Sequence, residues 1–138
     1  MIRNGLLIIL ILLSFNGVFA QIGYKYQLSS QDGIDVKYKI VQSKKESPVQ
    51  LCLRLKNNNE YDVNLKLNLE YSTGFTTKYQ SGELEVCIPK KYVKKGKSSG
   101  LAFELNSSDK ELFSSGKADL ELIKFEIEQI ETCRGRNQ

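Results

Sequence analysis

The sequence predicts an all-β protein: an antiparallel two-sheet sandwich of about seven short strands with one short helical turn. Three observations lead to this fold class. Apolar and polar residues alternate along most of the chain after residue 20, which is the period of strands with one buried face and one wet face. Residues that favour turns separate the alternating runs. The chain after residue 20 is also long enough to form one domain with a hydrophobic core.

Residues 1–20 have the three-part layout of a secretory signal peptide. Arg3 supplies a positive charge, 6–13 is an unbroken apolar run, and 18–20 fits a cleavage site. Because a membrane span needs about 20 apolar residues, we expect cleavage before Gln21 rather than retention as an integral membrane anchor. Gln21 also replaces the cysteine that lipid attachment would need. The sequence thus predicts export to the periplasm, the cell surface or the medium.

Five alternating runs are expected to form the main strands of a domain spanning 21–133. They cover 34–40, 49–56, 63–71, 84–88 and 101–105. A weaker strand is expected at 75–79, and a short edge strand at 24–28. The polar residues 134–138 are expected to form a flexible tail.

The connections between these runs carry their own signals. Asn57-Asn58-Asn59 is expected to form a tight hairpin, because asparagine tolerates left-handed backbone. Ser81-Gly82 is read as a turn, and 90–100 as a long lysine-rich connection. Ser108 and Glu111 have the spacing of a capping box, which predicts the helical turn.

The last run changes phase, since Leu120 and Leu122 fall on one face and Ile123, Phe125 and Ile127 on the other. A β-bulge near Leu122-Ile123 would restore a single buried face. A strand buried on both faces is the alternative.

Composition excludes several classes of function. The chain contains no histidine and no tryptophan. Without histidine there is no Ser-His-Asp triad, no Cys-His pair and no HExxH zinc site, so we expect no catalytic residues, no metal and no cofactor. The formal net charge of +4 is low for a nucleic-acid-binding domain. Export also argues against a nucleic-acid partner.

Cys52, Cys87 and Cys133 allow three pairings with one cysteine left over. Export favours a disulfide over a reactive thiol, and we favour Cys87 with Cys133, because this pair would tie down the last strand. Cys52 would pair with Cys87 if their strands were adjacent. Otherwise it is a free thiol.

A lysine-rich segment is the candidate contact for an anionic surface, such as acidic glycan or lipid headgroups. The alternative is a solvated loop that discourages strand edges from pairing. The residues are Lys90, Lys91, Tyr92, Lys94, Lys95 and Lys97.

Two carboxylate pairs, Glu83 with Glu85 and Glu126 with Glu128, each share one face of a strand. Residues two apart on a strand are about 7 Å apart, within the range that glycosidases use. Alternation alone also creates such pairs on any wet strand face, and we favour this structural interpretation.

The run from Leu53 to Leu65, in which a strand ends in an Asn-rich turn and a V-x-L pattern follows, resembles immunoglobulin-like and fibronectin type III-like sandwiches of small secreted bacterial proteins. The resemblance implies an immunoglobulin-like fold and no particular activity. The function expected is therefore an exported, non-catalytic binding, adhesion or envelope-accessory module for a protein or glycan outside the cytoplasm. The alternative is a module for glycans or anionic surfaces that uses residues 90–97.

Overall fold

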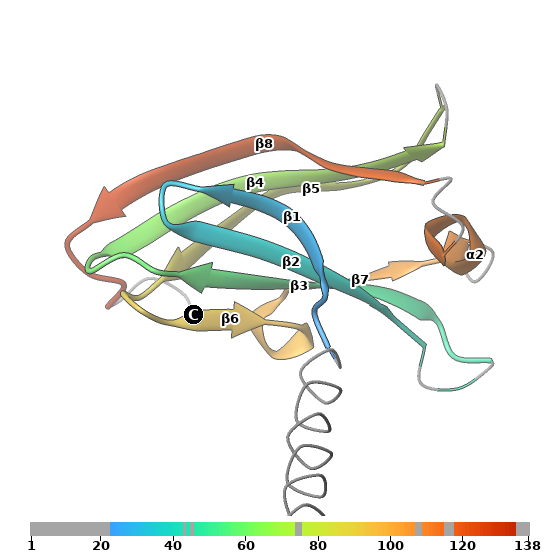
Figure 1. Ribbon diagram of the computed structural model, residues 1–138, viewed down its shortest axis with the longest axis horizontal. Helices are drawn as coiled ribbons and strands as arrows, with labels where there is room; N and C mark the ends of the chain where they lie inside the picture. The colour runs from blue at the N-terminus through green and yellow to red at the C-terminus, as the bar shows by residue number, and fades with distance from the viewer. Residues whose placement is uncertain are drawn as a thin grey trace, which may run out of the picture.

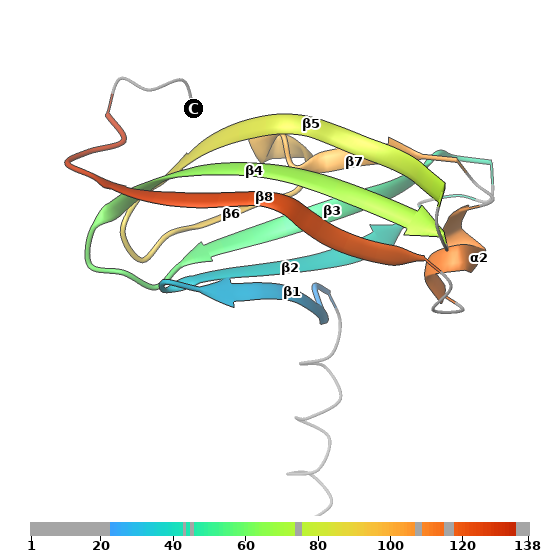
Figure 2. The same cartoon turned by 90° about the horizontal axis from the view of Figure 1, so that it is seen from above.

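The computed structural model describes residues 23–42, 44, 46–73, 76–106, 109–114 and 118–134. Over these residues it has the expected all-β architecture, with eight strands in two stacked antiparallel sheets (Figure 1). Figure 2 shows the short helix α2 (Asp109–Ser114) at one end of the two layers. The expectations for residues 1–20, for Ser108 and for 135–138 lie outside the described part of the chain. No helix within that part is long and apolar enough to cross a membrane.

Sheet A contains five strands, in which β1, β2 and β3 form a meander and two short strands share the far edge of β3. The strands are β1 (Tyr26–Gln31), β2 (Ile34–Val41), β3 (Val49–Asn57), β6 (Val93–Lys95) and β7 (Ala102–Leu105). Between β6 and β7 the chain forms the 3-10 turn η3 (Lys97–Ser99).

Sheet B has three long strands in the order β5, β4, β8. They are β4 (Asp62–Thr73), β5 (Thr76–Ile88) and β8 (Asp119–Ile130). The chain therefore passes between the sheets after β3, after β5 and after β7. Strands from the two halves of the sequence pair with each other, as β3 does with β7 and β4 with β8.

The core lies between the sheets and follows the alternation in the sequence. The apolar positions of β2, β3 and β4 point inward, and their aliphatic side chains are fully buried except Ile40 near the end of β2, which is half-buried. Burial of such a side chain stabilises the fold by about 1.5–3 kcal/mol. In β8 the register shifts opposite Asn68 and Leu69, so that Lys124 faces Asn68 and Leu122 faces Leu69. Ile123 is the extra residue and is 44% exposed, which confirms the expected bulge.

An aromatic cluster closes the α2 end of the sandwich. Tyr71 stacks on Tyr79 at 5.6 Å between ring centroids and contacts Phe113 of α2 at 5.1 Å. The Tyr71 hydroxyl donates a hydrogen bond to the buried carboxylate of Asp109. Burial and this carboxylate raise the pKa of Tyr71, so the hydroxyl keeps its proton.

Three connections differ from the sequence prediction. Asn57-Asn58-Asn59 does not close a hairpin, because β3 and β4 belong to different sheets. Ser81-Gly82 is not a turn but an irregularity inside the continuous strand β5, where Gly82 has φ 76° and the register with β4 shifts. The lysine-rich connection of 90–100 contains β6 and η3, since Val93–Lys95 pairs with β3.

Candidate binding site

A hollow of about 420 Å³ lies beside the disulfide, where β6 at the edge of sheet A approaches the end of β5 at the edge of sheet B. Hollows of this size accommodate small ligands. Its lining comes from β5, β6, η3, the loop before β6 and the segment after β8, and we term it the lysine hollow. The lining residues are Cys87, Pro89, Tyr92, Val93, Lys94, Lys95, Ser98, Ser99 and Cys133.

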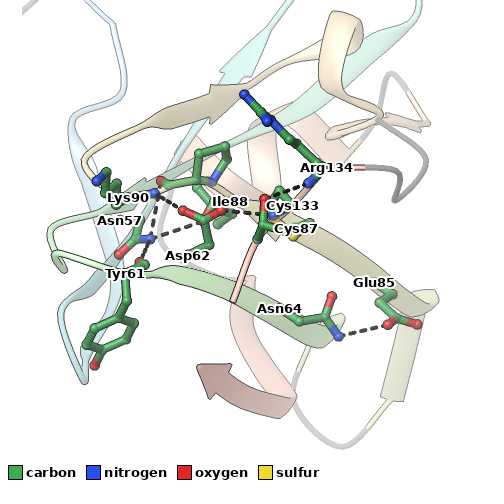
Figure 3. The surroundings of a disulfide bond; sticks show 12 residues. Asn57, Tyr61, Asp62, Asn64, Glu85, Cys87, Ile88, Lys90, Cys133 and Arg134 are labelled. Carbon is green, nitrogen blue, oxygen red and sulfur yellow. Dashed lines mark hydrogen bonds between the residues drawn. A yellow bond between two sulfur atoms is a disulfide. The ribbon is translucent and has the colours of Figure 1, made fainter. Parts of the chain in front are cut away.

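The disulfide joins Cys87, near the end of β5, to Cys133, just after β8, with Cα atoms 5.7 Å apart. It is the pair favoured from the sequence. Asp62 at the start of β4 reinforces it, since its two carboxylate oxygens accept hydrogen bonds from the backbone N–H groups of Lys90 and Cys133, each at 2.8 Å (Figure 3). These bonds, that from Lys90 first, lower the pKa of Asp62. One wall of the hollow is thus fixed by a covalent bond and an ionised carboxylate.

The buried side chain of Asn57 fixes the loop that carries Tyr92. Its Nδ2 donates to the carbonyls of Tyr61, Ile88 and Pro89 at 2.9, 3.1 and 3.3 Å. Its own backbone N–H donates to the carbonyl of Tyr92 at 3.0 Å. The chain from Pro89 to Tyr92 forms a tight turn, in which the Tyr92 N–H donates a hydrogen bond to the Pro89 carbonyl. Asn57 therefore links the connection from β3 to β4, where the chain passes between the sheets, to the loop that lines the hollow.

The opposite side of the hollow depends on Gly96. This residue has φ 65°, a conformation that side chains with a Cβ rarely adopt. Its N–H donates to the Leu53 carbonyl of β3, and its carbonyl accepts from Ser99 and Leu101. The bend turns the chain from β6 into η3, so that Ser98 and Ser99 line the same hollow as Lys94 and Lys95.

The lysine hollow combines three kinds of side chain. Tyr92 is 55% exposed and offers an aromatic face. Lys94 and Lys95 supply positive charge, and Ser98 and Ser99 supply hydroxyls that donate and accept hydrogen bonds. This set favours a ligand that is anionic, rich in hydroxyl groups and apolar on one face.

The structure divides the lysine-rich segment predicted from the sequence. Tyr92, Lys94 and Lys95 line the hollow, whereas Lys90, Lys91 and Lys97 do not. Lys91 instead binds Glu60 at 3.0 Å and donates to the Asn58 carbonyl at 2.8 Å. The six residues therefore do not form a single cationic cluster.

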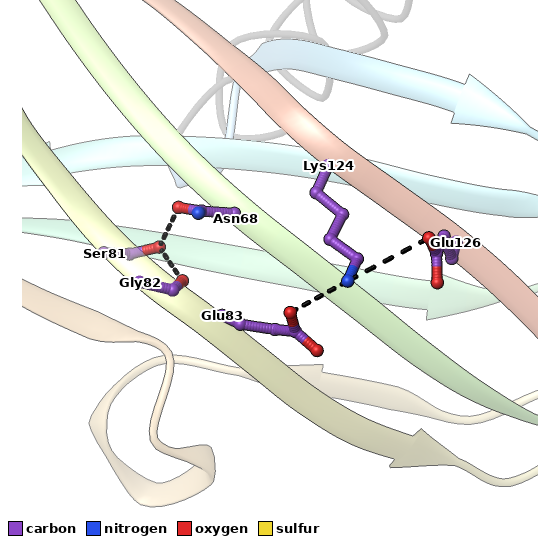
Figure 4. A network of polar contacts seen from close by, with 6 residues as sticks. All are labelled: Asn68, Ser81, Gly82, Glu83, Lys124 and Glu126. Atoms are coloured by element: carbon purple, nitrogen blue, oxygen red, sulfur yellow. Dashed lines mark hydrogen bonds and ion pairs between the residues drawn. The ribbon is translucent and has the colours of Figure 1, made fainter.

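The four glutamates of the carboxylate pairs lie on the outer face of sheet B. Glu83 accepts a hydrogen bond from Lys124 at 2.8 Å, which lowers its pKa (Figure 4), and Glu85 accepts one from Asn64. Glu126 and Glu128 line a smaller hollow of about 260 Å³ with Lys66 and Asn64. No group of three or more Cys, Asp or Glu among the described residues is placed to hold a metal ion.

Cys52 is the cysteine outside the disulfide, and it is buried. It lies on the outer side of β3 between Lys39 and Ala102. Burial raises the pKa of its thiol, so the thiol is protonated at neutral pH and a poor nucleophile.

Two features were missed at the sequence level, one inside the hollow and one on the sheet surface beside it. Ser98 and Ser99 reach the hollow only because of the bend at Gly96, which no local motif marks. Basic residues at the solvent positions of β2 and β3, such as Lys37 and Arg54, share one face with Lys95. The basic residues at every second position of these strands were the sequence signal from which this shared face could have been predicted.

The fold and the site together define a disulfide-tied β-sandwich with a small cationic hollow at one sheet edge. No protein-family model, curated protein or solved structure matches the chain.

Proposed function

We propose that the protein is an exported, non-catalytic binding module and that its lysine hollow binds an acidic saccharide. One observation carries the proposal: Tyr92, the most exposed large hydrophobic side chain of the described residues, lines the same hollow as two lysines and two serines. An exposed ring in a concave polar site is expected where a ligand supplies the missing apolar contact.

An acidic sugar complements each part of this lining. The C–H face of a sugar ring stacks on an aromatic side chain such as that of Tyr92. A carboxylate forms charge-assisted hydrogen bonds with Lys94 and Lys95. The sugar hydroxyls match the donor and acceptor capacity of Ser98 and Ser99.

The leader expected at 1–20 and the Cys87–Cys133 disulfide support export, because disulfides persist in oxidising compartments. The absence of histidine from the sequence supports a non-catalytic role, since histidine is the commonest general base. The fold class itself favours no activity.

Isothermal titration calorimetry with a short oligomer of galacturonic acid tests the proposal, with the galactose oligomer as the neutral control. We expect the acidic oligomer to bind. Lys94→Gln should weaken its binding about fivefold, which corresponds to the loss of one exposed ion pair. Tyr92→Ala should weaken it about tenfold through lost stacking.

Lys90→Gln is the matched control, because it removes the same charge from an exposed residue outside the hollow. It should bind as the unmodified protein does. Equal binding of the neutral oligomer, or equal weakening by Lys90→Gln and Lys94→Gln, would contradict an acidic-sugar site in the hollow.

A further inference from the structure

A second surface, on the outer face of sheet A, is formed by basic side chains at solvent-facing positions of β2, β3 and β6. We term it the cationic face. Its members are Lys37, Lys39, Arg54, Lys56 and Lys95. It meets the lysine hollow at Lys95, and its other four residues lie outside the hollow.

Three of these cations stand in one row across the sheet. Lys37 faces Arg54 in the β2–β3 pair, and Arg54 faces Lys95 in the β3–β6 pair. Adjacent strands are about 4.8 Å apart, and like charges directly opposite each other destabilise a sheet. None of the ion pairs formed among the described residues includes any of the three. The row therefore keeps an excess of positive charge, which Asp35 offsets only in part.

Asp35 is an acidic neighbour of this row, opposite Lys56. Its oxygens accept hydrogen bonds from Ser30 at 2.7 Å and Asn58 at 2.9 Å. These bonds, that from Ser30 first, lower the pKa of Asp35. The charges of Lys37 and Lys56 lower this pKa further, so Asp35 offsets part of the positive charge besides holding Ser30 of β1 and Asn58 after β3.

The outer face of sheet B has the opposite charge. Among the described side chains of this face, Lys66 and Lys124 lie among a larger number of carboxylates, and Lys124 reaches across β4 to Glu83 (Figure 4). The carboxylates are Glu70, Glu83, Glu85, Asp119, Glu121, Glu126 and Glu128. A negatively charged surface would attract sheet A and repel sheet B, which fixes the orientation of the molecule.

The start of the described chain lies on the cationic face. The ammonium of Lys39 is 4.5 Å from the ring centroid of Tyr24, and a Cβ added to Gly96 would be 3.3 Å from the Tyr24 hydroxyl.

We propose that the cationic face docks on an anionic lipid bilayer, with sheet B turned away from it. The face belongs to a sheet surface rather than to a hollow, and four of its five cations are lysines, which act as point charges rather than as bidentate ligands. Such an array can attract many lipid headgroups that lie in one plane. Each basic residue near the bilayer surface adds to the electrostatic attraction. This inference is independent of saccharide binding in the lysine hollow.

Co-sedimentation with vesicles of phosphatidylcholine, with and without phosphatidylglycerol, tests the proposal. We expect binding only to the vesicles that contain phosphatidylglycerol, with loss at high salt. The double variant Lys37→Gln/Lys56→Gln should lower the vesicle partition coefficient about 30-fold. This factor follows from the binding free energy that two basic residues near an anionic surface contribute. The control, Lys66→Gln with Lys90→Gln, removes the same charge elsewhere and should bind almost unchanged.

Tyr92→Ala separates the two proposals, because it should weaken saccharide binding about tenfold and leave vesicle binding unchanged. Equal loss in the Lys37/Lys56 and Lys66/Lys90 variants, or no binding to phosphatidylglycerol at low salt, would overturn bilayer docking. Two other results would also overturn it. If the Lys37/Lys56 variant lost only its binding to soluble polygalacturonate, the face would bind a glycan. If it lost only self-association in sedimentation velocity, the face would bind a second copy of the chain.

Discussion

The carboxylate of Asp62 joins two chain segments that lie far apart in the sequence. One oxygen holds the N–H of Lys90 after β5, and the other holds that of Cys133 after β8. The disulfide and Asp62 therefore tie the same end of sheet B (Figure 3). Because the hydrogen bonds favour the ionised carboxylate, the pKa of Asp62 lies below its ordinary value.

The lowered pKa predicts how acid acts on this contact. The contribution of Asp62 to the free energy of unfolding is fully present above the pKa of about 3.9 that the group has when unfolded. It is lost as the pH falls through the lower folded-state pKa. Asp62→Asn should therefore unfold at lower urea at pH 7 and lose less stability than the unmodified protein between about pH 4 and pH 2.

Urea denaturation followed by circular dichroism measures this difference. Glu60→Gln is a suitable control, because its ion pair with Lys91 is solvent-exposed and contributes little. Parallel stability–pH curves for Asp62→Asn and the unmodified protein would contradict the assigned role.

At the scale of the elements, the two faces of the β2–β3 pair have opposite effects on the stability of the sheet. Their inner faces bury Val36 and Leu55 opposite each other, whereas their outer faces place Lys37 opposite Arg54. The inner pairs stabilise the sheet and the outer pair opposes it. The unfavourable outer pair supports the proposed docking of this face on an anionic bilayer.

Lys37→Gln is therefore expected to raise the free energy of unfolding by about 0.2–1 kcal/mol, because it removes the repulsion with Arg54. The measurement is urea denaturation at low salt, where the repulsion is least screened. Lys66→Gln, on the acidic face, is the matched control and should give no gain. A loss of stability in Lys37→Gln would show that the row is not strained.

The strands and the bulge could be predicted from the sequence because they depend on local alternation. The inward positions of β3 and β4 are the apolar residues of a period of two, and the phase change at Ile123 marks the bulge. The path between the sheets could not be predicted in this way. Asn57 allows a hairpin locally, but its side chain binds the carbonyls of Ile88 and Pro89 from a distant strand.

The same distinction applies to the candidate site. Lys94 and Lys95 were predicted because lysines cluster in the sequence, and Tyr92 because it lies among them. The rest of the hollow comes from the end of β5, from Cys133 and from the bend at Gly96, which meet β6 only in the folded chain. The immunoglobulin-like resemblance stays a prediction.

At the scale of the whole molecule, the Cys87–Cys133 disulfide closes a loop with a sequence separation of 46. It holds the end of β8 against β5 across β4, and both cysteines line the lysine hollow. The disulfide thus serves the stability of sheet B and the shape of the site together.

Replacing both cysteines by serine should lower the free energy of unfolding by about 4 kcal/mol in the chain-entropy model. Thermal and urea denaturation measure this loss, and Cys52→Ala, which leaves the disulfide intact, should lose less. The double variant should also bind the galacturonic acid oligomer more weakly while it keeps vesicle binding. An unchanged affinity for the oligomer would show that the disulfide wall does not shape the site.

The two faces give the sandwich a positive side and a negative side, with the lysine hollow at one edge between them. Two kinds of anion are therefore expected at different places: a saccharide in the hollow and a bilayer under sheet A. The lysine hollow carries the central claim.

Amide chemical shifts recorded during titration with the galacturonic acid oligomer test that claim most directly. We predict saturable shifts at Tyr92, Lys94, Ser98, Ser99 and Cys133, and none with the galactose oligomer. Shifts confined to Lys37, Lys39 and Lys56, or no saturable shift around the disulfide, would contradict it.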